Sequence, residues 1–285
     1  MNQLVRNLRV STFSLSPLTP GIGAEVGDLD LSKPLDGETR DGLRQALRDW
    51  KVLFFRDQAI TTEQHLAFAR NFGDLEVHPF APSKPGDPEV MTITHNKDDR
   101  GQENTWHSDV TWREAPSLGS ILRCLECPPV GGDTLFADMY AAYDGLKDDV
   151  KDAIEGRFAV HDFAHFRRGL RKQGKSEAEI DAFNKAYPMV QHPIVRTHPD
   201  TGRKALYVNA AFTQSVVGME AAQSEALLKH LYAQAAIPEY QCRFRWEADS
   251  VAFWDNRASQ HYAVSDYWPA VRRMERVTIV GDRPV

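Results

Sequence analysis

The chain has 285 residues, 42% apolar and 26% charged, a composition typical of a soluble globular protein with one large domain or two small ones. Its net charge of −6 and the lack of an evident basic patch argue against a nucleic-acid partner, so local arginines must attract any anionic substrate. No apolar run reaches the roughly 18 residues of a membrane span, and the N-terminus lacks a secretory signal core, so we expect no membrane association and a cytoplasmic location.

The first half of the chain contains two helical patterns and several strand patterns. Residues 40–50 carry an apolar stripe at helical spacing. Residues 61–73 begin with Thr61 and Gln64 at the spacing of a capping box and end at Gly73, which predicts a second helix. The strands predicted in this half are 51–55, 90–94, 104–112 and 117–126.

The second half of the chain continues this mixture. Helices are predicted at 137–146, 148–156 and 219–236. Strands are predicted at 192–198, 205–209, 240–247, 250–255 and 272–281. Residues 163–190 are long and polar, and we interpret them as an insertion that forms a lid.

These elements favour a mainly β fold with flanking helices. The strands do not alternate regularly with helices, which argues against a doubly wound parallel sheet. Many short strands with turn residues between them are typical of a β-sandwich or jelly roll, with the helices packed outside. Because no repeat or long linker interrupts the chain, we expect residues 1–285 to form a single domain.

Two familiar motifs are present only in weak form. The three cysteines, an odd number, argue against a disulfide framework. Cys124 and Cys127 form a C-x-x-C, but they lie at the end of a predicted strand, where this spacing places the thiols on opposite faces. A second ligand pair for zinc is missing, so we interpret them as buried or edge cysteines. Residues 21–27, "GIGAEVG", miss the dinucleotide fingerprint by one position and follow no apolar strand.

The stretch "TWHSDVTW" is a candidate metal site. In a strand, His107 and Asp109 share one face, while Trp106 and Trp112 face the other way, where we expect packing. An imidazole and a carboxylate side by side can bind one cation, and two histidines with one carboxylate form the facial triad of non-haem iron oxygenases. The alternative is a strand whose polar residues face water.

The C-terminal region offers a third ligand and two anion-binding side chains. His261 follows a strong strand and stands in a turn-rich stretch. Arg272 and Arg276 share one face of the last predicted strand, a face that carries no carboxylate of its own. Because the arginine fork binds carboxylate or sulfonate through bidentate hydrogen bonds, this face predicts either partners elsewhere in the fold or two bound anions. The alternative is a pair of surface arginines on an edge strand.

Nearly end to end, the chain resembles the taurine dioxygenase (TauD/TfdA) family of Fe(II)/2-oxoglutarate-dependent dioxygenases. The similar segments, in order, are "LTPGIGAEV", "FFRDQAIT", "FARNFGDLEVHP", "WHSDVTW", "GGDTLF", "HPIVRTHPDTGRKALYVN", "WDNRASQHYAVSDY" and "ERVTIVGDRPV". The resemblance implies a double-stranded β-helix, which is a jelly roll and agrees with the strand pattern. It also implies a homo-oligomer, either a dimer or a tetramer.

The resemblance implies site residues position by position. His107, Asp109 and His261 match the iron ligands of the family. Thr134 and Arg272 match the residues that hold the far carboxylate of 2-oxoglutarate, the co-substrate that is consumed together with O2. For Thr134, the alternative is simple turn chemistry after two glycines.

The same comparison implies a substrate pocket. Arg276 matches the arginine that binds the sulfonate of taurine, and His78 and Phe212 match pocket positions. The alternatives are a structural histidine and a core phenylalanine. Two positions depart from the taurine pattern: Ala81 replaces a tyrosine, and Glu103 replaces an asparagine. These departures favour a larger organosulfonate, an alkyl sulfate ester or another small anionic compound over taurine.

The implied reaction is hydroxylation of this anion, with 2-oxoglutarate converted to succinate and CO2. A hydroxylated carbon that bears sulfur or an ester oxygen collapses to an aldehyde and releases sulfite or sulfate. One alternative is a dioxygenase of aryloxyalkanoates or other carboxylates. Two others come from different classes, a metal-dependent jelly-roll hydrolase and a non-catalytic binding protein; neither needs the co-substrate anchor Arg272.

Overall fold

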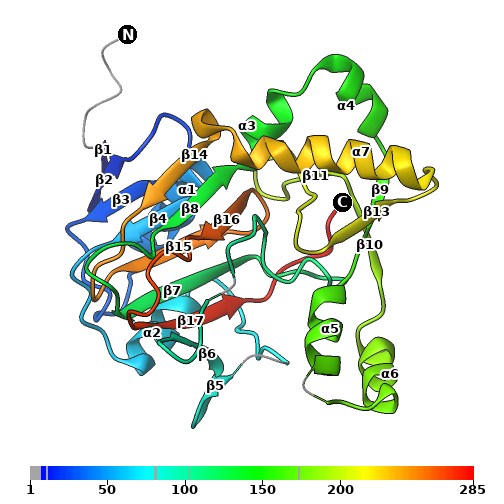
Figure 1. The fold of residues 1–285 in the computed structure, drawn as a ribbon. Coiled ribbons are helices and arrows are strands. Elements are labelled where there is room, and N and C mark those ends of the chain that lie inside the picture. Colours follow the sequence, from blue (N-terminus) through cyan, green and yellow to red (C-terminus); the bar gives the residue numbers. More distant parts are fainter. Residues whose placement is uncertain (1–7, 11, 80–81, 102, 173) are drawn as a thin grey trace.

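The computed structural model describes residues 8–10, 12–79, 82–101, 103–172 and 174–285 (Figure 1). Its largest sheet has the strand order β1-β2-β3-β4-β15-β7-β17-β6-β5. These strands are β1 Leu8–Val10, β2 Phe13–Pro17, β3 Ala24–Gly27, β4 Val52–Phe55, β5 Ser83–Lys84, β6 Asp87–His95, β7 Gly119–Glu126, β15 Val251–Asp255 and β17 Arg272–Ile279. All pairs are antiparallel except β3 with β4, in agreement with the mainly β prediction.

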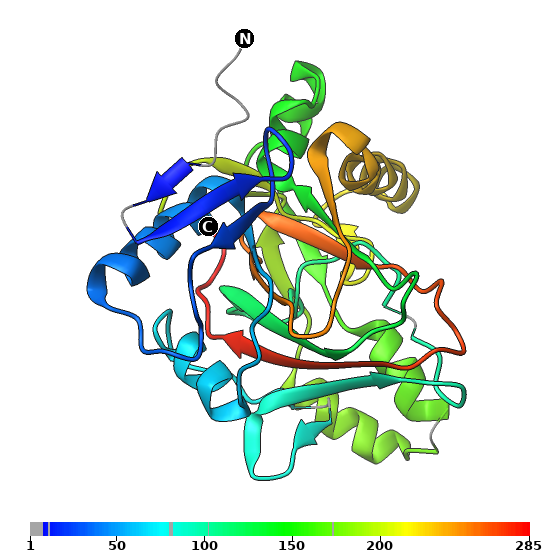
Figure 2. The ribbon, with the colours of Figure 1, turned by 90° about the vertical axis from the view of Figure 1, so that its left-hand side faces the viewer.

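A second sheet, β14-β8-β16, packs against the large one to complete a jelly roll (Figure 2). It consists of β8 Thr134–Asp138, β14 Gln241–Phe244 and β16 Ser259–Ala263. The smaller sheets contain β9 Phe158–His161, β10 Val190–Pro193, β11 Val195–Thr197, β12 Lys204–Leu206 and β13 Thr213–Val216.

Helices cover the outer sides of both sheets (Figure 1). The helices of the described residues are α1 Gly37–Trp50, α2 Thr62–Arg70, α3 Met139–Asp144, α4 Asp148–Ile154, α5 Ala164–Lys172, α6 Glu177–Ala186, α7 Ala221–Tyr232, and the 3-10 turns η1 Ala233–Ala236 and η2 Pro238–Tyr240. Of these, α5 and α6 lie apart from the two sheets (Figure 1). The capping box predicted at Thr61 and Gln64 is present at the start of α2. Among the described residues, none of the helices combines the length and the apolar character needed to cross a bilayer.

Strands β4 and β15 are buried along their whole length, and both are apolar except for Asp255 at the end of β15, because both of their faces are covered. Leu53 of β4 and Phe253 of β15 pack against α1 and α2. Phe54 and Trp254, one residue along each strand, point the other way into the core between the two sheets. This two-sided burial makes the centre of the large sheet a rigid base for the segments that carry the candidate site.

The structure corrects the predicted strand over 104–112. His107 forms only an isolated bridge to His261, and the chain turns immediately afterwards, with Val110 in the left-handed region (φ 47°). The side chain of Asn256 accepts a hydrogen bond from the backbone N–H of Asp109 and thereby holds this turn. Alternating strand faces therefore do not explain how His107 and Asp109 come together; a tight turn does.

A second correction concerns His261. It lies on β16, paired with Phe136 of β8, and not in a turn-rich stretch. The polar sequence "SQHYA" hides this strand because β16 is lined by functional and hydrogen-bonding groups instead of β-branched residues. The predicted strand at 192–198 is divided at Ile194 into β10 and β11.

Candidate active site

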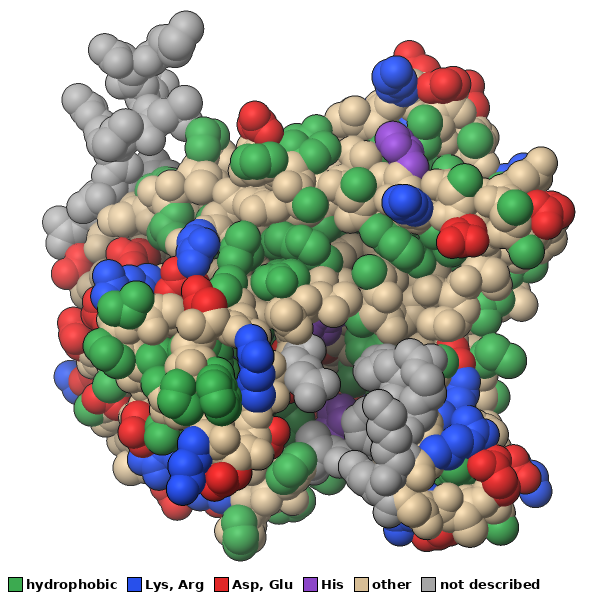
Figure 3. Space-filling model, viewed as in Figure 1, with side chains coloured by type: hydrophobic (Ala, Val, Ile, Leu, Met, Phe, Trp, Pro, Cys, Tyr) green, Lys and Arg blue, Asp and Glu red, His purple; other side chains and the backbone are tan. Residues whose placement is uncertain are grey.

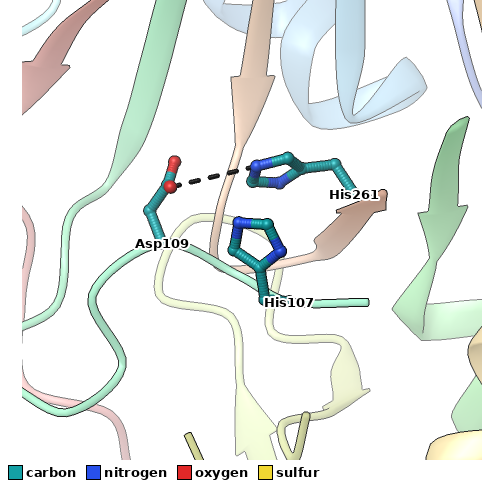
Figure 4. Close-up of side chains that lie close together, drawn as sticks. All are labelled: His107, Asp109 and His261. Atoms are coloured by element: carbon teal, nitrogen blue, oxygen red, sulfur yellow. Dashed lines mark ion pairs between the residues drawn. The ribbon is translucent and has the colours of Figure 1, made fainter. Parts of the chain in front are cut away.

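His107, Asp109 and His261 point toward one another (Figure 4). One potential ligand atom from each lies within 4.8 Å of the others. The backbone fixes the two histidines directly, because His107 N donates to His261 O at 3.1 Å and His261 N donates to His107 O at 2.8 Å. The structure thus brings together the three residues proposed as metal ligands from segments far apart in the sequence.

Both histidines can offer a ring nitrogen as a metal ligand. His107 Nδ1 lies 2.7 Å from the carbonyl oxygen of Thr105, so Nδ1 carries the hydrogen and Nε2 keeps a free lone pair. Burial, reinforced by the neighbouring His107, lowers the pKa of His261 to about 3. Its Nε2 lies 3.9 Å from Asp109 Oδ1.

The two oxygens of Asp109 have different partners. Oδ2 accepts from Ser120 Oγ at 2.8 Å and from Asn256 Nδ2 at 3.3 Å. Oδ1 accepts from Arg276 Nη1 at 2.7 Å and faces the histidines. Burial alone would raise the pKa of Asp109, but the charge of the Arg276 guanidinium and the hydrogen bond from Ser120 hold it well below its usual range. The carboxylate is therefore ionised, and Oδ1 is its atom on the side of the histidines.

This donor set fits a divalent transition metal. Two neutral imidazoles and one carboxylate on one side leave the opposite side open, as in non-haem iron sites. Hydrogen bonds to Thr105, Ser120 and Asn256 orient the donors, which is the usual role of the surroundings of a metal site. Histidine side chains lie deep in the hollow visible on this side of the molecule (Figure 3).

Asn256 is a site residue that sequence reasoning missed. It follows β15, and its Oδ1 accepts from Trp254 Nε1 at 3.0 Å as well as from the backbone of Asp109. A signal was present, since the polar Asp255 ends the fully buried strand β15 and the polar Asn256 directly follows it.

We expect Asn256→Ala to weaken metal binding by about 10- to 100-fold, because loss of a hydrogen bond to a ligating carboxylate typically has this effect. Titration with Mn(II), followed by electron paramagnetic resonance, measures the change. Asn71→Ala, which removes an amide at the end of α2, is the control and should leave Mn(II) affinity unaltered. Equal affinities of Asn256→Ala and the parent protein would contradict the positioning role of Asn256.

Arg272 is the first residue of β17 and Thr134 is the first residue of β8, and both side chains border Trp246. Arg272 is buried, its Nε has no hydrogen-bond partner, and no carboxylate of the described residues pairs with it. Thr134 Oγ1 accepts from Trp246 Nε1 at 2.9 Å. A buried guanidinium without a carboxylate is costly unless an anion satisfies it, so this position suits a carboxylate ligand.

Arg272 and Arg276, on one face of β17, thus have different environments. Arg276 forms an ion pair with Asp109, which lies on another segment. Arg272 forms no ion pair with a carboxylate in the part of the chain that the structure describes. The interpretation of Arg276 as a partner of a residue elsewhere in the fold is confirmed for this structure. A surface position is wrong for Arg272, which is only 4% exposed.

His78 and Phe212 both lie beside the metal-ligand group. Burial lowers the pKa of His78 to about 4, with the Arg276 charge acting in the same direction and Asp109 opposing it. The ring centroid of Phe212 lies 6.3 Å from that of His107. Phe212 also packs against an apolar cluster that includes Trp112. Its position therefore agrees both with a residue of the substrate pocket and with a residue that packs in the core.

The remaining sequence features fall outside the metal-ligand group. Ala81 lies outside the described residues. Glu103 is half-exposed and pairs with His95 Nε2 at 3.5 Å. The cysteines are free, as expected, but the Cys127 thiol lies beyond β7 and within hydrogen-bonding reach of Cys124, so their placement on opposite strand faces is wrong. The packing role predicted for the tryptophans is confirmed, since Trp106 and Trp112 each join an apolar cluster.

A family model described as "Taurine catabolism dioxygenase TauD, TfdA family" matches residues 14–278. The chain belongs to the TauD/TfdA family. The match covers every site residue discussed above, and it makes this protein a 2-oxoglutarate-dependent dioxygenase.

Named relatives of this TauD/TfdA enzyme differ in substrate. An alpha-ketoglutarate-dependent sulfate ester dioxygenase from Pseudomonas putida is 36% identical, with 96% of this chain and 91% of the relative covered. An alpha-ketoglutarate-dependent 2,4-dichlorophenoxyacetate dioxygenase from Cupriavidus pinatubonensis is 33% identical, with coverages of 95% and 98%.

The fold of this TauD/TfdA enzyme is also that of solved structures. The crystal structure of AAD-2 in complex with Mn(II) and N-oxalylglycine superposes with a TM-score of 0.81 at 31% identity, over 96% of this chain and 99% of that one. The jelly-roll prediction is therefore confirmed. The enzyme uses a metal and 2-oxoglutarate.

Proposed function

We propose that this enzyme uses Fe(II), 2-oxoglutarate and O2 to hydroxylate a small organic anion, an alkyl sulfate ester or an organosulfonate. His107, Asp109 and His261 would hold the iron. The single observation that carries the proposal is the convergence of these three side chains beside Arg276. Arg276 lies on the same strand as Arg272, which is buried and has no carboxylate partner among the described residues. Iron bound here, together with 2-oxoglutarate and O2, supplies the oxidation that converts a C–H bond to C–OH while succinate and CO2 form.

Two arginines on one strand divide the work of binding two anions. Arg272 and Thr134 would bind the far carboxylate of 2-oxoglutarate, and Arg276 would bind the substrate anion. Their four-residue separation on β17 corresponds to about 13 Å at the usual rise of a strand, so one anion cannot occupy both positions. Each arginine can form two parallel charge-assisted hydrogen bonds, which would orient its anion as well as attract it.

The position of Arg276 would determine which carbon of the substrate is oxidised. Its Nη1 lies 2.7 Å from the proposed ligand atom Asp109 Oδ1, so an anion bound to the rest of the fork would lie next to the metal. The carbon attached to the anionic group is then the nearest one. Its hydroxylation in a sulfate ester gives an unstable product that collapses to an aldehyde and sulfate; a sulfonate gives an aldehyde and sulfite.

Aromatic side chains beside the site favour a substrate with an apolar tail. Trp112 packs with Phe163 at 4.9 Å between ring centroids and with Tyr187 at 5.3 Å. Phe212 joins this cluster and reaches His107. An alkyl chain on the anion would gain about 0.8 kcal/mol for each methylene buried against such rings. The 36% identity to a sulfate ester dioxygenase supports the same class.

The proposal is tested by a substrate screen with Fe(II) and 2-oxoglutarate. Oxygen consumption and succinate are measured with alkyl sulfates, alkanesulfonates and aryloxyalkanoates, and released sulfate or sulfite is quantified. Turnover of a sulfate ester or sulfonate with matching inorganic product is the expected result. Preferential turnover of aryloxyalkanoates would instead establish the second candidate, a carboxylate dioxygenase, which the arginine fork and the 33% identical relative also support.

We expect Tyr187→Ala to reduce the preference for long alkyl chains, because Tyr187 is a partly exposed wall of the aromatic cluster. The ratio of kcat/KM for an octyl sulfate to that for a butyl sulfate should fall about threefold or more, the loss of roughly one buried methylene. Tyr143→Ala, which removes a half-buried tyrosine of α3, is the control. An unchanged ratio in Tyr187→Ala would exclude this wall as a chain-length determinant.

We further propose that residues 163–190 form a lid over the substrate. Helices α5 and α6 occupy this segment at one end of the molecule (Figure 1). Phe163 precedes them and Tyr187 follows them, and both rings pack on Trp112. The two ends of the segment are thus fastened three residues from Asp109, which would let a bound substrate influence the helices. Protection of α5 and α6 from hydrogen exchange on addition of substrate is the expected result.

We also propose a single domain and a homo-oligomeric assembly, on the basis of the resemblance to the TauD/TfdA family. Residues 1–285 would form one domain, and the protein would assemble as a dimer or tetramer. Light scattering measures the assembly, and a single calorimetric unfolding transition would support one cooperative unit.

A further inference from the structure

The proposed co-substrate anchor has a partner that neither the motif spacing nor the proposed reaction requires. Trp246 lies two residues beyond the end of β14, is 3% exposed, and donates its indole N–H to Thr134 Oγ1 at 2.9 Å. Thr134 is the first residue of β8 and is also buried. The contact joins two separate segments of the second sheet at the position where the carboxylate of 2-oxoglutarate would bind.

The hydrogen bond determines what the threonine hydroxyl can do. A hydroxyl has one hydrogen to donate and two lone pairs that accept. An indole nitrogen can only donate, so Trp246 occupies a lone pair of Thr134 and leaves its hydrogen free. A carboxylate can only accept. Trp246 therefore holds the Thr134 hydroxyl in the orientation in which it can donate to a carboxylate.

The same indole also borders the guanidinium of Arg272. The guanidinium carbon lies 5.8 Å from the ring centroid of Trp246 and 6.0 Å from that of Tyr267. Aromatic rings attract the cation without using its N–H donors as a carboxylate would. Gly132 also approaches closely: a Cβ there would lie 3.2 Å from Tyr267 and 3.5 Å from Arg272. The arginine is thus confined while its donors remain available to a ligand.

We propose that Trp246 is a positioning residue for 2-oxoglutarate, which sets the donor orientation of Thr134 and confines Arg272. The inference rests on the proposed roles of Thr134 and Arg272 as the anchor of the far carboxylate. Trp246 itself acts through these two side chains and need not contact the co-substrate.

Trp246→Phe tests the proposal, because it keeps an aromatic ring beside Arg272 and removes the N–H donor together with the five-membered ring that carries it. We expect the KM for 2-oxoglutarate to rise about three- to tenfold, as for loss of one oriented hydrogen bond, while kcat and the KM for the primary substrate change less than about twofold. Trp268→Phe is the matched control: its indole N–H donates to Lys97 O, outside the anchor, and the KM for 2-oxoglutarate should stay constant. An unchanged KM in Trp246→Phe would overturn the proposal.

A double variant separates positioning from simple packing. If Trp246 acts through the hydroxyl, Trp246→Phe combined with Thr134→Val should have nearly the same KM for 2-oxoglutarate as Thr134→Val alone. If the fold-changes in the KM for 2-oxoglutarate of the two single variants instead multiply in the double variant, the two residues act independently, and the inference is overturned. If Trp246→Phe fails to fold, Trp246→His, which retains a ring N–H, is compared with Trp246→Leu; only the histidine variant should approach the parent KM.

Failure of the inference differs from failure of the proposed function. If Thr134→Val and Arg272→Met raise the KM for 2-oxoglutarate while Trp246→Phe does not, the anchor stands and the role of Trp246 is wrong. If none of the three changes raises this KM, the anchor assignment itself is wrong, and the inference fails with it.

Discussion

His107→Ala is expected to abolish turnover, with a fall in iron-dependent succinate formation of at least about a thousandfold. Residues that only orient a metal ligand contribute about 10- to 100-fold, so loss of a ligand should exceed that range. The substitution should leave the local backbone unchanged, because the hydrogen bonds between His107 and His261 use backbone atoms, which alanine keeps. Mn(II) titration, thermal unfolding and succinate formation together measure the result.

The matched control for this prediction is His230→Ala, which removes an exposed histidine on α7. It should retain parental turnover and Mn(II) affinity. A folded His107→Ala protein that still binds Mn(II) with parental affinity would remove His107 from the metal site. Retained metal affinity with lost turnover would assign His107 to the reaction but not to the metal.

Arg276→Lys is expected to raise the KM for the primary substrate about 30-fold or more, and the KM for 2-oxoglutarate less than about threefold. Lysine keeps the positive charge beside Asp109 but loses the planar fork that binds an oxyanion at two points. Changes at a buried, charged hydrogen-bonding pair typically cost about 2–5 kcal/mol, which corresponds to this range. Steady-state kinetics with each substrate varied in turn measure both constants.

Arg273→Ala provides the control on the same strand. Arg273 points to the opposite face of β17, is exposed and pairs with Glu126, so neither KM should change more than about twofold. Equal increases in both KM values for Arg276→Lys would contradict its assignment to the primary substrate. Mn(II) affinity, measured on the same variant, shows whether an effect comes instead through Asp109.

Sequence patterns predicted several helices and strands of this fold because these features depend on residues that are close together in the sequence. The capping box at Thr61 depends on residues three apart, and the apolar run 251–254 reflects burial of both faces of β15. Arg272 and Arg276 could be placed on one side of a strand because side chains alternate along it. These features need no knowledge of the rest of the chain.

The parts of the site that escaped prediction depend on contacts between distant segments. The pattern of residues 104–112 predicts a strand, yet Asn256, 147 positions from Asp109, holds a turn there. Trp246 and Thr134 are 112 positions apart, and no periodicity links an indole to a hydroxyl. His261 lies on a strand whose sequence is dominated by polar groups, so strand propensity could not identify it.

If Asp109 binds the metal and Arg276 binds the substrate anion, as proposed, the ion pair between these two residues would couple the two binding events thermodynamically. A cation that shares the charge of Asp109 weakens the hold of this carboxylate on Arg276 and leaves more of the guanidinium's attraction for an incoming anion. Linkage is reciprocal: if the metal increases the affinity for the substrate anion by some factor, the anion increases the affinity for the metal by the same factor. Under the proposed roles of Asp109 and Arg276, the arginine would make binding cooperative, so that the metal would be retained most strongly when an anion is present to be oxidised.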